Sequence, residues 1–376
     1  MRPTKNSSQA HLGVRCYNSV AALPSTCQNL FQIGEQDSFD LSPEWFRLLS
    51  DTALPEHQVP RFYLLEQAGC ARILMPLLLP TPGSKVRGVT GLTNFYSTIF
   101  RPVIEQNVGV SDLAAMLRQV TQDTKTSVLR FDAMDPEHPS FMLLNQALRQ
   151  IGLLPFKFFG FGNWYLEAQN LSWEDYLKQL PGKHRNTLKR LGKKFTEAGG
   201  SFKIISGHEP GLDAALHAYQ EVYSSSWKVP EPYPDFIPGF IRMCAHQGWL
   251  RLGLAFIGDQ PIAAQFWLVL HGRACIYKVS YNEKFSEFSP GSLLTGQLMR
   301  HVIEVDQVRE VDYLIGDDAY KKIWMSHRRE RWGIVAYNPR TLAGLWGALR
   351  EAMARTAKSL LNRIRARPAN SRHGNG

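Results

Sequence analysis

A short polar cluster in the C-terminal part of the sequence combines side chains that acid–base chemistry needs. Residues 317–322 read Asp-Asp-Ala-Tyr-Lys-Lys and follow a predicted strand, and open α/β folds bind ligands at strand ends. Asp318 can serve as a base or hold an amine, Tyr320 can donate a proton, and Lys321 can contact an anion. In the alternative interpretation, Asp317 caps a short helix while the other side chains face water.

A second candidate site is the start of a predicted helix, where the sequence reads Ser289-Pro290-Gly291-Ser292. The first turn of a helix carries unpaired backbone N–H groups and a partial positive charge, which suit an anion. Gly291 permits close approach of the backbone, and the hydroxyls of Ser289 and Ser292 can donate hydrogen bonds. The alternative is that Pro-Gly is ordinary turn chemistry.

Two further segments are candidates for contacting a substrate. Trp227 and Lys228 precede a proline-rich loop and could line an acceptor pocket, although a tryptophan often belongs to a core. Arg185 lies in a basic helix predicted at 183–197, which would suit a phosphate backbone or form a solvated face. The histidines show no metal-ligand spacing, so the sequence predicts no metal site.

The elements that must position these residues form two α/β halves, because predicted helices and strands alternate along both. The first half is predicted to contain helices at 42–49, 111–121 and 140–151 and strands at 61–66, 71–79, 127–131 and 156–168. The second half is predicted to contain helices at 172–181, 183–197, 211–225, 239–246, 291–306 and 317–325 and strands at 201–206, 249–257, 261–270, 273–281, 308–315 and 332–337. The predicted organisation is a poorly ordered lead at 1–30, lobes at 31–168 and 169–340, and a tail at 341–376.

The net charge of +10 is confined to two segments. Residues 173–198 carry +4, residues 341–376 carry +6, and the rest of the chain is neutral. This distribution argues against a surface coated with phosphate-binding charge. The sequence shows no apolar run of membrane-spanning length, no secretory signal and only five scattered cysteines, so we expect a reducing, cytoplasmic location.

The tail has the pattern of a basic amphipathic helix. Its apolar residues recur at helical spacing from Leu342 to Ile364, and its arginines and lysine lie mainly on the other side. With Trp346 on the apolar side, this pattern predicts peripheral contact with the inner face of a membrane through residues 341–367. The alternative is docking of the apolar side onto the protein's own core.

Five segments, taken in order, resemble those of the FemAB-like and cellulose-biosynthesis-type branch of the GNAT acyltransferase superfamily. They are LTNFY at 92–96, WEDYLKQLPGKHRNTLKR at 173–190, SWK at 226–228, FSPGSLL at 288–294 and VDYLIGDDAYKKIW at 311–324. The resemblance implies two GNAT-like lobes with mixed, largely antiparallel central sheets flanked by helices and a cleft between them. It also implies transfer of an acyl group to an amine.

The resemblance suggests acyl-CoA, such as acetyl-CoA, as co-substrate, with no tightly bound cofactor. Segment 288–293 departs from the Gln/Arg-x-x-Gly-x-Gly/Ala pattern of acetyl-CoA-dependent members, because it has one glycine and no basic first residue. The expected acceptor is an amine on an envelope, lipid or polysaccharide precursor, either free or lipid-linked. Two alternatives stay open: an aminoacyl-tRNA-dependent transferase, and a GNAT-like binding module without catalytic activity.

Overall fold

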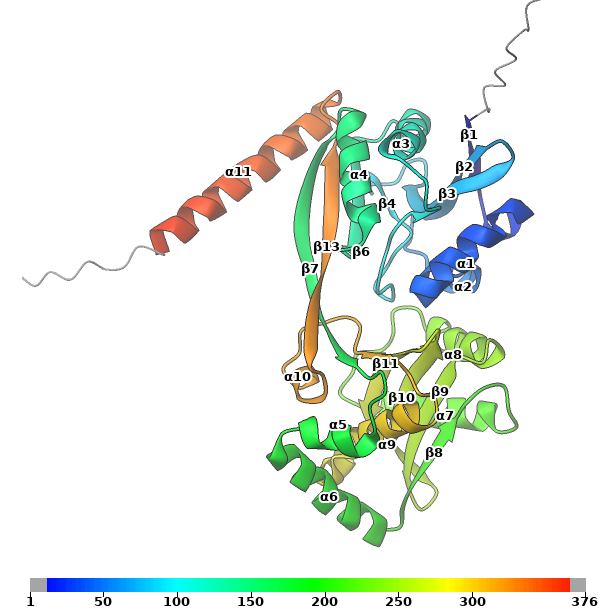
Figure 1. Ribbon diagram of the computed structural model, residues 1–376, viewed down its shortest axis with the longest axis vertical. Coiled ribbons are helices and arrows are strands. Elements are labelled where there is room, and N and C mark those ends of the chain that lie inside the picture. The colour runs from blue at the N-terminus through cyan, green and yellow to red at the C-terminus, as the bar shows by residue number, and fades with distance from the viewer. Residues whose placement is uncertain (1–11, 366–376) are drawn as a thin grey trace, which may run out of the picture.

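The two halves of the chain form lobes that share one β-sheet (Figure 1). The computed structural model describes residues 12–365 of the 376-residue chain. The strands follow the order β1-β2-β3-β4-β6-β13-β7-β12-β11-β10-β9-β8, with β5 beside β3. Neighbouring strands are antiparallel except for β4 with β6 and β11 with β12. The predicted mixed, largely antiparallel α/β architecture is confirmed, and the structure adds that the sheets of the lobes join edge to edge.

The upper lobe in Figure 1 comes mainly from the first 150 residues. Its strands are β1 (Leu12–Tyr17), β2 (Gln58–Gln67), β3 (Cys70–Pro80), β4 (Val89–Gly91), β5 (Val103–Ile104) and β6 (Val128–Met134). Its helices are α1 (Gln28–Asp37), α2 (Pro43–Thr52), α3 (Val110–Thr124) and α4 (Pro139–Gln150). Helix α2 begins as the sequence predicts, because the Ser42 hydroxyl accepts a hydrogen bond from the Trp45 amide at 3.1 Å.

The lower lobe combines helices with a mainly antiparallel set of strands, three of which follow one another directly in the sequence. Its helices are α5 (Trp173–Gln179), α6 (Gly182–Glu197), α7 (Leu212–Ser224), α8 (Phe236–His246), α9 (Pro290–Glu304) and α10 (Lys321–Trp324). Its strands are β8 (Gly200–Ile205), β9 (Leu250–Ile257), β10 (Gln260–Leu270), β11 (Arg273–Tyr281) and β12 (Glu310–Asp312). The β10–β11 turn needs two residues with positive φ, and His271 and Gly272 supply them at 46° and 73°.

Two long strands connect the lobes (Figure 1). Strand β7 (Leu154–Glu167) pairs with β13 (His327–Tyr337) over most of its length and with β12 at its last three residues. Strand β13 also pairs with β6. Although β13 follows the lower-lobe segment in sequence, it therefore completes the upper-lobe sheet.

A shared aromatic core packs the lobes against each other. It lies among α1 and α2 of the upper lobe and α7 and α8 of the lower lobe, whereas separate cores lie under α3 and α4 and under α5, α6 and α9. The ring of Trp45 lies 5.2 Å from that of Phe240, and Tyr96 stacks on Phe236 at 4.0 Å between ring centroids. The relative position of the lobes is thus fixed by buried contacts as well as by strand pairing.

Regular structure begins closer to the N-terminus than the sequence predicts. Residues Leu12–Tyr17 form strand β1, which pairs with the edge of β2, and Cys27 and Leu30 are buried. The prediction of an irregular lead is therefore wrong for residues 12–30, because pairing satisfies the open backbone groups of β2. Residues 1–11 lie outside the described residues. Among residues 12–365, no helix combines the length and the apolarity that a membrane span requires.

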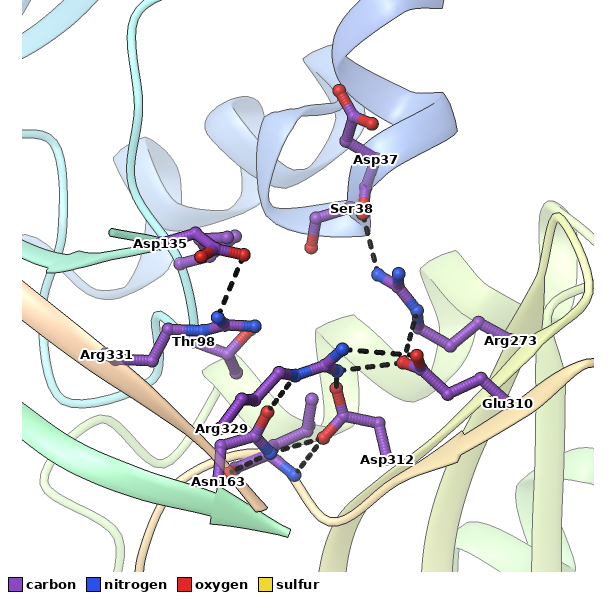
Figure 2. A network of polar contacts seen from close by, with 12 residues as sticks. Asp37, Ser38, Thr98, Asp135, Asn163, Arg273, Glu310, Asp312, Arg329 and Arg331 are labelled. Atoms are coloured by element: carbon purple, nitrogen blue, oxygen red, sulfur yellow. Dashed lines mark hydrogen bonds and ion pairs between the residues drawn. The ribbon is translucent and has the colours of Figure 1, made fainter. Parts of the chain in front are cut away.

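A buried polar network holds the junction where β7, β11, β12 and β13 meet (Figure 2). Asp312 is 3% exposed and forms an ion pair with Arg329, which also contacts Glu310 at 2.8 Å. Asn163 donates a hydrogen bond to Asp312 at 2.6 Å and accepts one from Arg329 at 2.6 Å. Arg273 contacts Glu310 at 2.9 Å and donates to the backbone carbonyl of Asp37 in the upper lobe. The network therefore ties the four strands of the junction to the end of α1.

The ionisation of Asp312 depends on these partners. Burial alone would raise the pKa of this carboxyl, but Arg329 and the Asn163 hydrogen bond hold the pKa below its ordinary value of 3.8. A carboxylate with a lowered pKa stabilises the folded state above its unfolded pKa, and that contribution is lost as the pH falls through the folded pKa.

We expect Asp312→Asn to lower the free energy of unfolding by about 3–5 kcal/mol at neutral pH, because Arg329 loses a buried partner. The difference from the unsubstituted protein should shrink as the pH falls below 3.8. Urea unfolding at several pH values measures both effects. As a control, Asp213→Asn removes the exposed pair with Arg242 and should cost less than about 1 kcal/mol. Equal effects of the two substitutions would contradict a stabilising role of the buried network.

Candidate active site

The candidate site lies where two parallel strands separate. Strand β11 pairs with β12 through the residue pairs Arg273↔Glu310, Ala274↔Val311 and Cys275↔Asp312. Beyond Cys275, β11 continues to Tyr281, whereas the chain after Asp312 leaves the sheet. Backbone groups on this edge of β11 therefore have no partner in β12, and a ligand can approach them.

The predicted strand at 308–315 is wrong beyond Asp312, and the reason is a turn that this side chain helps to form. The Asp312 carboxylate accepts a hydrogen bond from the amide of Leu314 at 2.6 Å, and Leu314 has a φ of 55°. Gly316 follows with a φ of 105°, where a side chain would be strained. Helix α10 likewise spans only Lys321–Trp324, so the predicted helix at 317–325 is shorter than expected.

The separated strands open onto a cavity of about 760 Å³ between the lobes. Phe95, Tyr96 and Thr98 line it from the upper lobe. The lower lobe contributes His184, Trp227, Lys228, Ile276, Tyr277, Lys278, Val279, Tyr281, Gly291, Ser292, Thr295, Tyr313, Leu314, Ile315, Asp318, Tyr320, Lys321, Ile323 and Trp324. The cavity is of the size that small-molecule sites have, with aromatic walls and a few polar groups.

Seven of the nine predicted site residues line this cavity, namely Trp227, Lys228, Gly291, Ser292, Asp318, Tyr320 and Lys321. The other two have structural contacts. Ser289 lies in the left-handed region at φ 49°, and its carbonyl accepts from the amide of Ser292 at the start of α9. Arg185 donates to the carbonyl of Lys178 at 2.8 Å and so caps α5.

The residues of the polar cluster at 317–322, called the acidic cluster below, make different contacts. Asp317 accepts hydrogen bonds from Trp164 at 2.7 Å and from Arg328, so it fixes the loop. The Lys321 ammonium is buried, donates to loop carbonyls, and lies 3.2 Å from Asp318. Burial, followed by the charge of Asp318, raises the pKa of Tyr320 to about 12. At neutral pH the Tyr320 hydroxyl is therefore protonated and can donate a hydrogen bond.

A second polar group was missed by sequence reasoning. Glu231 accepts hydrogen bonds from Tyr223 at 2.6 Å, Lys278 at 2.7 Å and Tyr96 at 2.8 Å. Burial alone would raise the pKa of Glu231, but these donors hold it below its ordinary value. Burial and the neighbouring Lys278 charge lower the pKa of Lys228 to about 8. A lysine in the middle of strand β11, between Tyr277 and Val279, was the one signal of this network in the sequence.

His184 was also missed as a cavity residue. Its ring packs edge-on against Trp324 at 4.7 Å, and its Nε2 atom is buried without a hydrogen-bond partner in the described part of the chain. Burial lowers the pKa of His184, so the ring is neutral at neutral pH. A neutral imidazole facing a cavity can accept a proton.

The start of α9 packs tightly against the aromatic wall. A Cβ on Gly291 would meet the Tyr281 ring at 3.3 Å, and Tyr281 lies 4.8 Å from the Trp227 ring. The Gly291 carbonyl accepts from the buried amide of Gln265 at 2.8 Å. Because Pro290 has no N–H, the Gly291 amide is the first that this helix can offer to an anion.

Comparisons with known proteins agree with this geometry. Residues 182–322 match the family model described as the acetyltransferase (GNAT) domain, and they include α9, β12 and the acidic cluster. No curated protein that was compared matches the chain. The lower lobe is thus a GNAT acyltransferase-type domain.

Solved structures with the same fold span both lobes. FemX has a TM-score of 0.60 at 11% identity, with coverage of 86% of this chain and 97% of that one. A tandem GNAT protein from the clavulanic acid biosynthesis pathway has a TM-score of 0.51 at 12% identity, with 88% and 99% covered. The C-terminal domain of a protein assigned as a lysylphosphatidylglycerol synthetase, from Agrobacterium fabrum, has a TM-score of 0.52 at 14% identity, with 87% and 95% covered. At these identities the likeness concerns the fold, and it confirms the two-lobed GNAT-like architecture.

The electrostatics of the cleft can be tested at Lys228. Lys278→Met removes a positive neighbour and frees the Glu231 carboxylate, so we expect the pKa of Lys228 to rise from about 8 toward 10.5. NMR titration of ¹³C-methylated lysines measures the change, with Lys228→Arg assigning the signal. Lys322→Met, at an exposed lysine, should leave the pKa of Lys228 unchanged. A Lys228 signal that titrates near 10.5 in the unsubstituted protein would contradict the buried environment.

Proposed function

We propose that the protein is an N-acyltransferase that moves an acyl group from acyl-CoA to a primary amine. The observation that carries this proposal is the cavity at the point where β11 and β12 separate, beside the start of α9 and within the matched GNAT domain. The FemAB-like and cellulose-biosynthesis-type branch suggested by the sequence is part of the same proposal.

The acyl-CoA donor would contact three features of the cavity wall. Ser292 and the Gly291 amide at the start of α9 would hold its phosphate groups, because a helix N-terminus favours anions. The open edge of β11 would pair with the amide groups of the CoA arm. The aromatic residues Trp227 and Tyr281 would cover the apolar part of that arm.

The chemistry assigns one step to each polar residue of the acidic cluster. Asp318 would accept the proton that the ammonium form of the acceptor must lose before it can attack. The amine nitrogen would then bond to the acyl carbon, and the carbon–sulfur bond would break. Tyr320, protonated at neutral pH, would stabilise the oxyanion and give its proton to the departing thiolate. The second proton that the nitrogen loses as the amide forms would return to the Tyr320 phenolate and restore the phenol. Lys321 would position Asp318 through their ion pair.

The acceptor we propose is an amine on an envelope, lipid or polysaccharide precursor. The large, open cleft between lobes has room for an extended acceptor, and Lys228 and Lys278 place positive charge on its wall. Among proteins with this fold, the lysylphosphatidylglycerol synthetase is named for a lipid product.

An aminoacyl-tRNA donor is the second candidate, and two observations favour it. Pro290 removes one amide from the anion site at α9, and Lys183, Lys189 and Arg190 are exposed on α6. Against it, Lys193 and Lys194 of the same helix pair with Glu197 and Glu287. An RNA donor would bind with an affinity that falls steeply with salt concentration.

The donor site can be tested with Ser292→Glu. A carboxylate at this position is compatible with the first turn of a helix, so α9 should stay intact, but it would repel phosphate groups. We expect the affinity for acetyl-CoA to fall by about tenfold or more, measured by calorimetry. Ser286→Glu, an exposed residue away from the cavity lining, makes the same charge change and should have little effect. If acetyl-CoA does not bind the unsubstituted protein and aminoacyl-tRNA does, the second candidate is correct.

The catalytic roles can be tested with Asp318→Asn and Tyr320→Phe. Each should lower turnover by about 100-fold with the fold intact, because each removes one proton-transfer or oxyanion contact. Initial rates with a panel of amines and acetyl-CoA, together with circular dichroism, provide the measurement. Unchanged turnover in both variants would remove these residues from the mechanism, and the absence of any turnover in the unsubstituted protein with either donor would favour a binding module without catalytic activity.

A further inference from the structure

Helix α11 (Leu342–Arg365) follows β13 and projects from the upper lobe away from the body of the protein (Figure 1). Its first turns dock through small residues. A Cβ on Gly344 would clash with the Asn338 carbonyl, one on Gly347 would meet the Tyr337 ring at 2.5 Å, and Ala348 is 4% exposed. The docking face of α11 is therefore made of residues too small to contribute much apolar area.

The large apolar residues lie on the other side of the helix. They are Leu342, Leu345, Trp346, Leu349 and Met353, with exposed fractions of 90%, 43%, 66%, 49% and 59%. At 100° per residue these five positions lie opposite Gly344, Gly347 and Ala348. The apolar face of α11 is thus not the face that packs on the protein, and docking of that face onto the protein's own core is not what the described residues show.

Positive charge borders the exposed apolar face and lies opposite it. At 100° per residue Arg350 flanks the apolar positions and Lys358 lies opposite them, and both side chains are exposed. Arg363 and Arg365 follow in the same helix. The acidic residue Glu351 pairs with Arg355, whose guanidinium also donates to the carbonyl of Lys157 at 2.7 Å. Residues 341–376 carry a net charge of +6. A surface that covers this face must therefore offer an apolar layer to the large side chains and negative charge to the basic residues around them.

We propose that α11 docks on the surface of an anionic lipid bilayer, with Trp346, Leu349 and Met353 in the interface and the basic residues among the lipid headgroups. Charge complementarity favours this occupant over a second copy of the chain, because pairing two α11 helices would bring two strongly basic segments together. The proposal does not depend on acyl transfer, and it would hold for a binding module as well.

Vesicle flotation of the full chain tests the proposal. Binding to vesicles of phosphatidylcholine mixed with phosphatidylglycerol should be strong at low salt, released at high salt, and weak with phosphatidylcholine alone. Trp346→Ser with Met353→Ser should weaken binding at least tenfold. Ala354→Ser, off the apolar face, should leave it unchanged. Arg350→Gln with Lys358→Gln should weaken binding to anionic vesicles, whereas Lys203→Gln with Lys284→Gln, which removes the same charge from the lower lobe, should not.

All substituted side chains are exposed, so thermal melts should match that of the unsubstituted protein. No binding to anionic vesicles, or equal binding by all variants, would overturn the proposal. If sedimentation shows a dimer that Trp346→Ser with Met353→Ser dissociates, and vesicles do not bind, the exposed face is an interface between copies of this chain.

Discussion

The buried pair of Asp312 and Arg329 controls the point at which β12 leaves the sheet. One carboxylate oxygen accepts from the Leu314 amide and starts the turn, while the other meets the guanidinium that comes from β13. Without that turn, the chain after Asp312 could continue beside β11, and the open edge of β11 would be lost. The cavity, the acidic loop and the approach to α9 therefore depend on a charge that is stable in the interior only because its partners come from three other segments.

The aromatic core between the lobes makes the cleft a fixed structure. Tyr96 stacks on Phe236 with one face of its ring, and its hydroxyl donates to Glu231 at 2.8 Å. The same residue thus belongs to the core and to the cavity wall. Because Tyr277 of β11 also donates to the Tyr96 carbonyl at 2.8 Å, the upper-lobe wall and the open strand keep one relative position. A cleft of this kind can orient two substrates without closing around them.

Burial shifts several pKa values in the cleft. It raises the pKa of Tyr320 to about 12, lowers the pKa of Lys228 to about 8, and lowers the pKa of His184. Glu231 stays ionised because three donors converge on it. The cleft therefore combines a donor phenol, the carboxyl side chain of Asp318 and an amine that can lose its proton near neutral pH, which is a suitable set for moving protons on and off nitrogen.

The sequence by itself determined the features that depend on local patterns. Ser42 and Pro43 start α2, the turn residues His271 and Gly272 place β10 beside β11, and the order of motifs indicated two GNAT-like lobes. Seven of the nine predicted site residues reach one cavity, because they lie just beyond a strand end or a helix end, or in the first turn of a helix, that the pattern located. Other features required the tertiary structure, because they depend on contacts between residues distant in the chain. These include the pairing of β13 with β6 and β7, the early end of β12, and the Glu231 network, whose donors are up to 135 residues away. The pattern of α11 likewise identified an apolar face, but only the packing of Gly344 and Ala348 showed that this face points away from the protein.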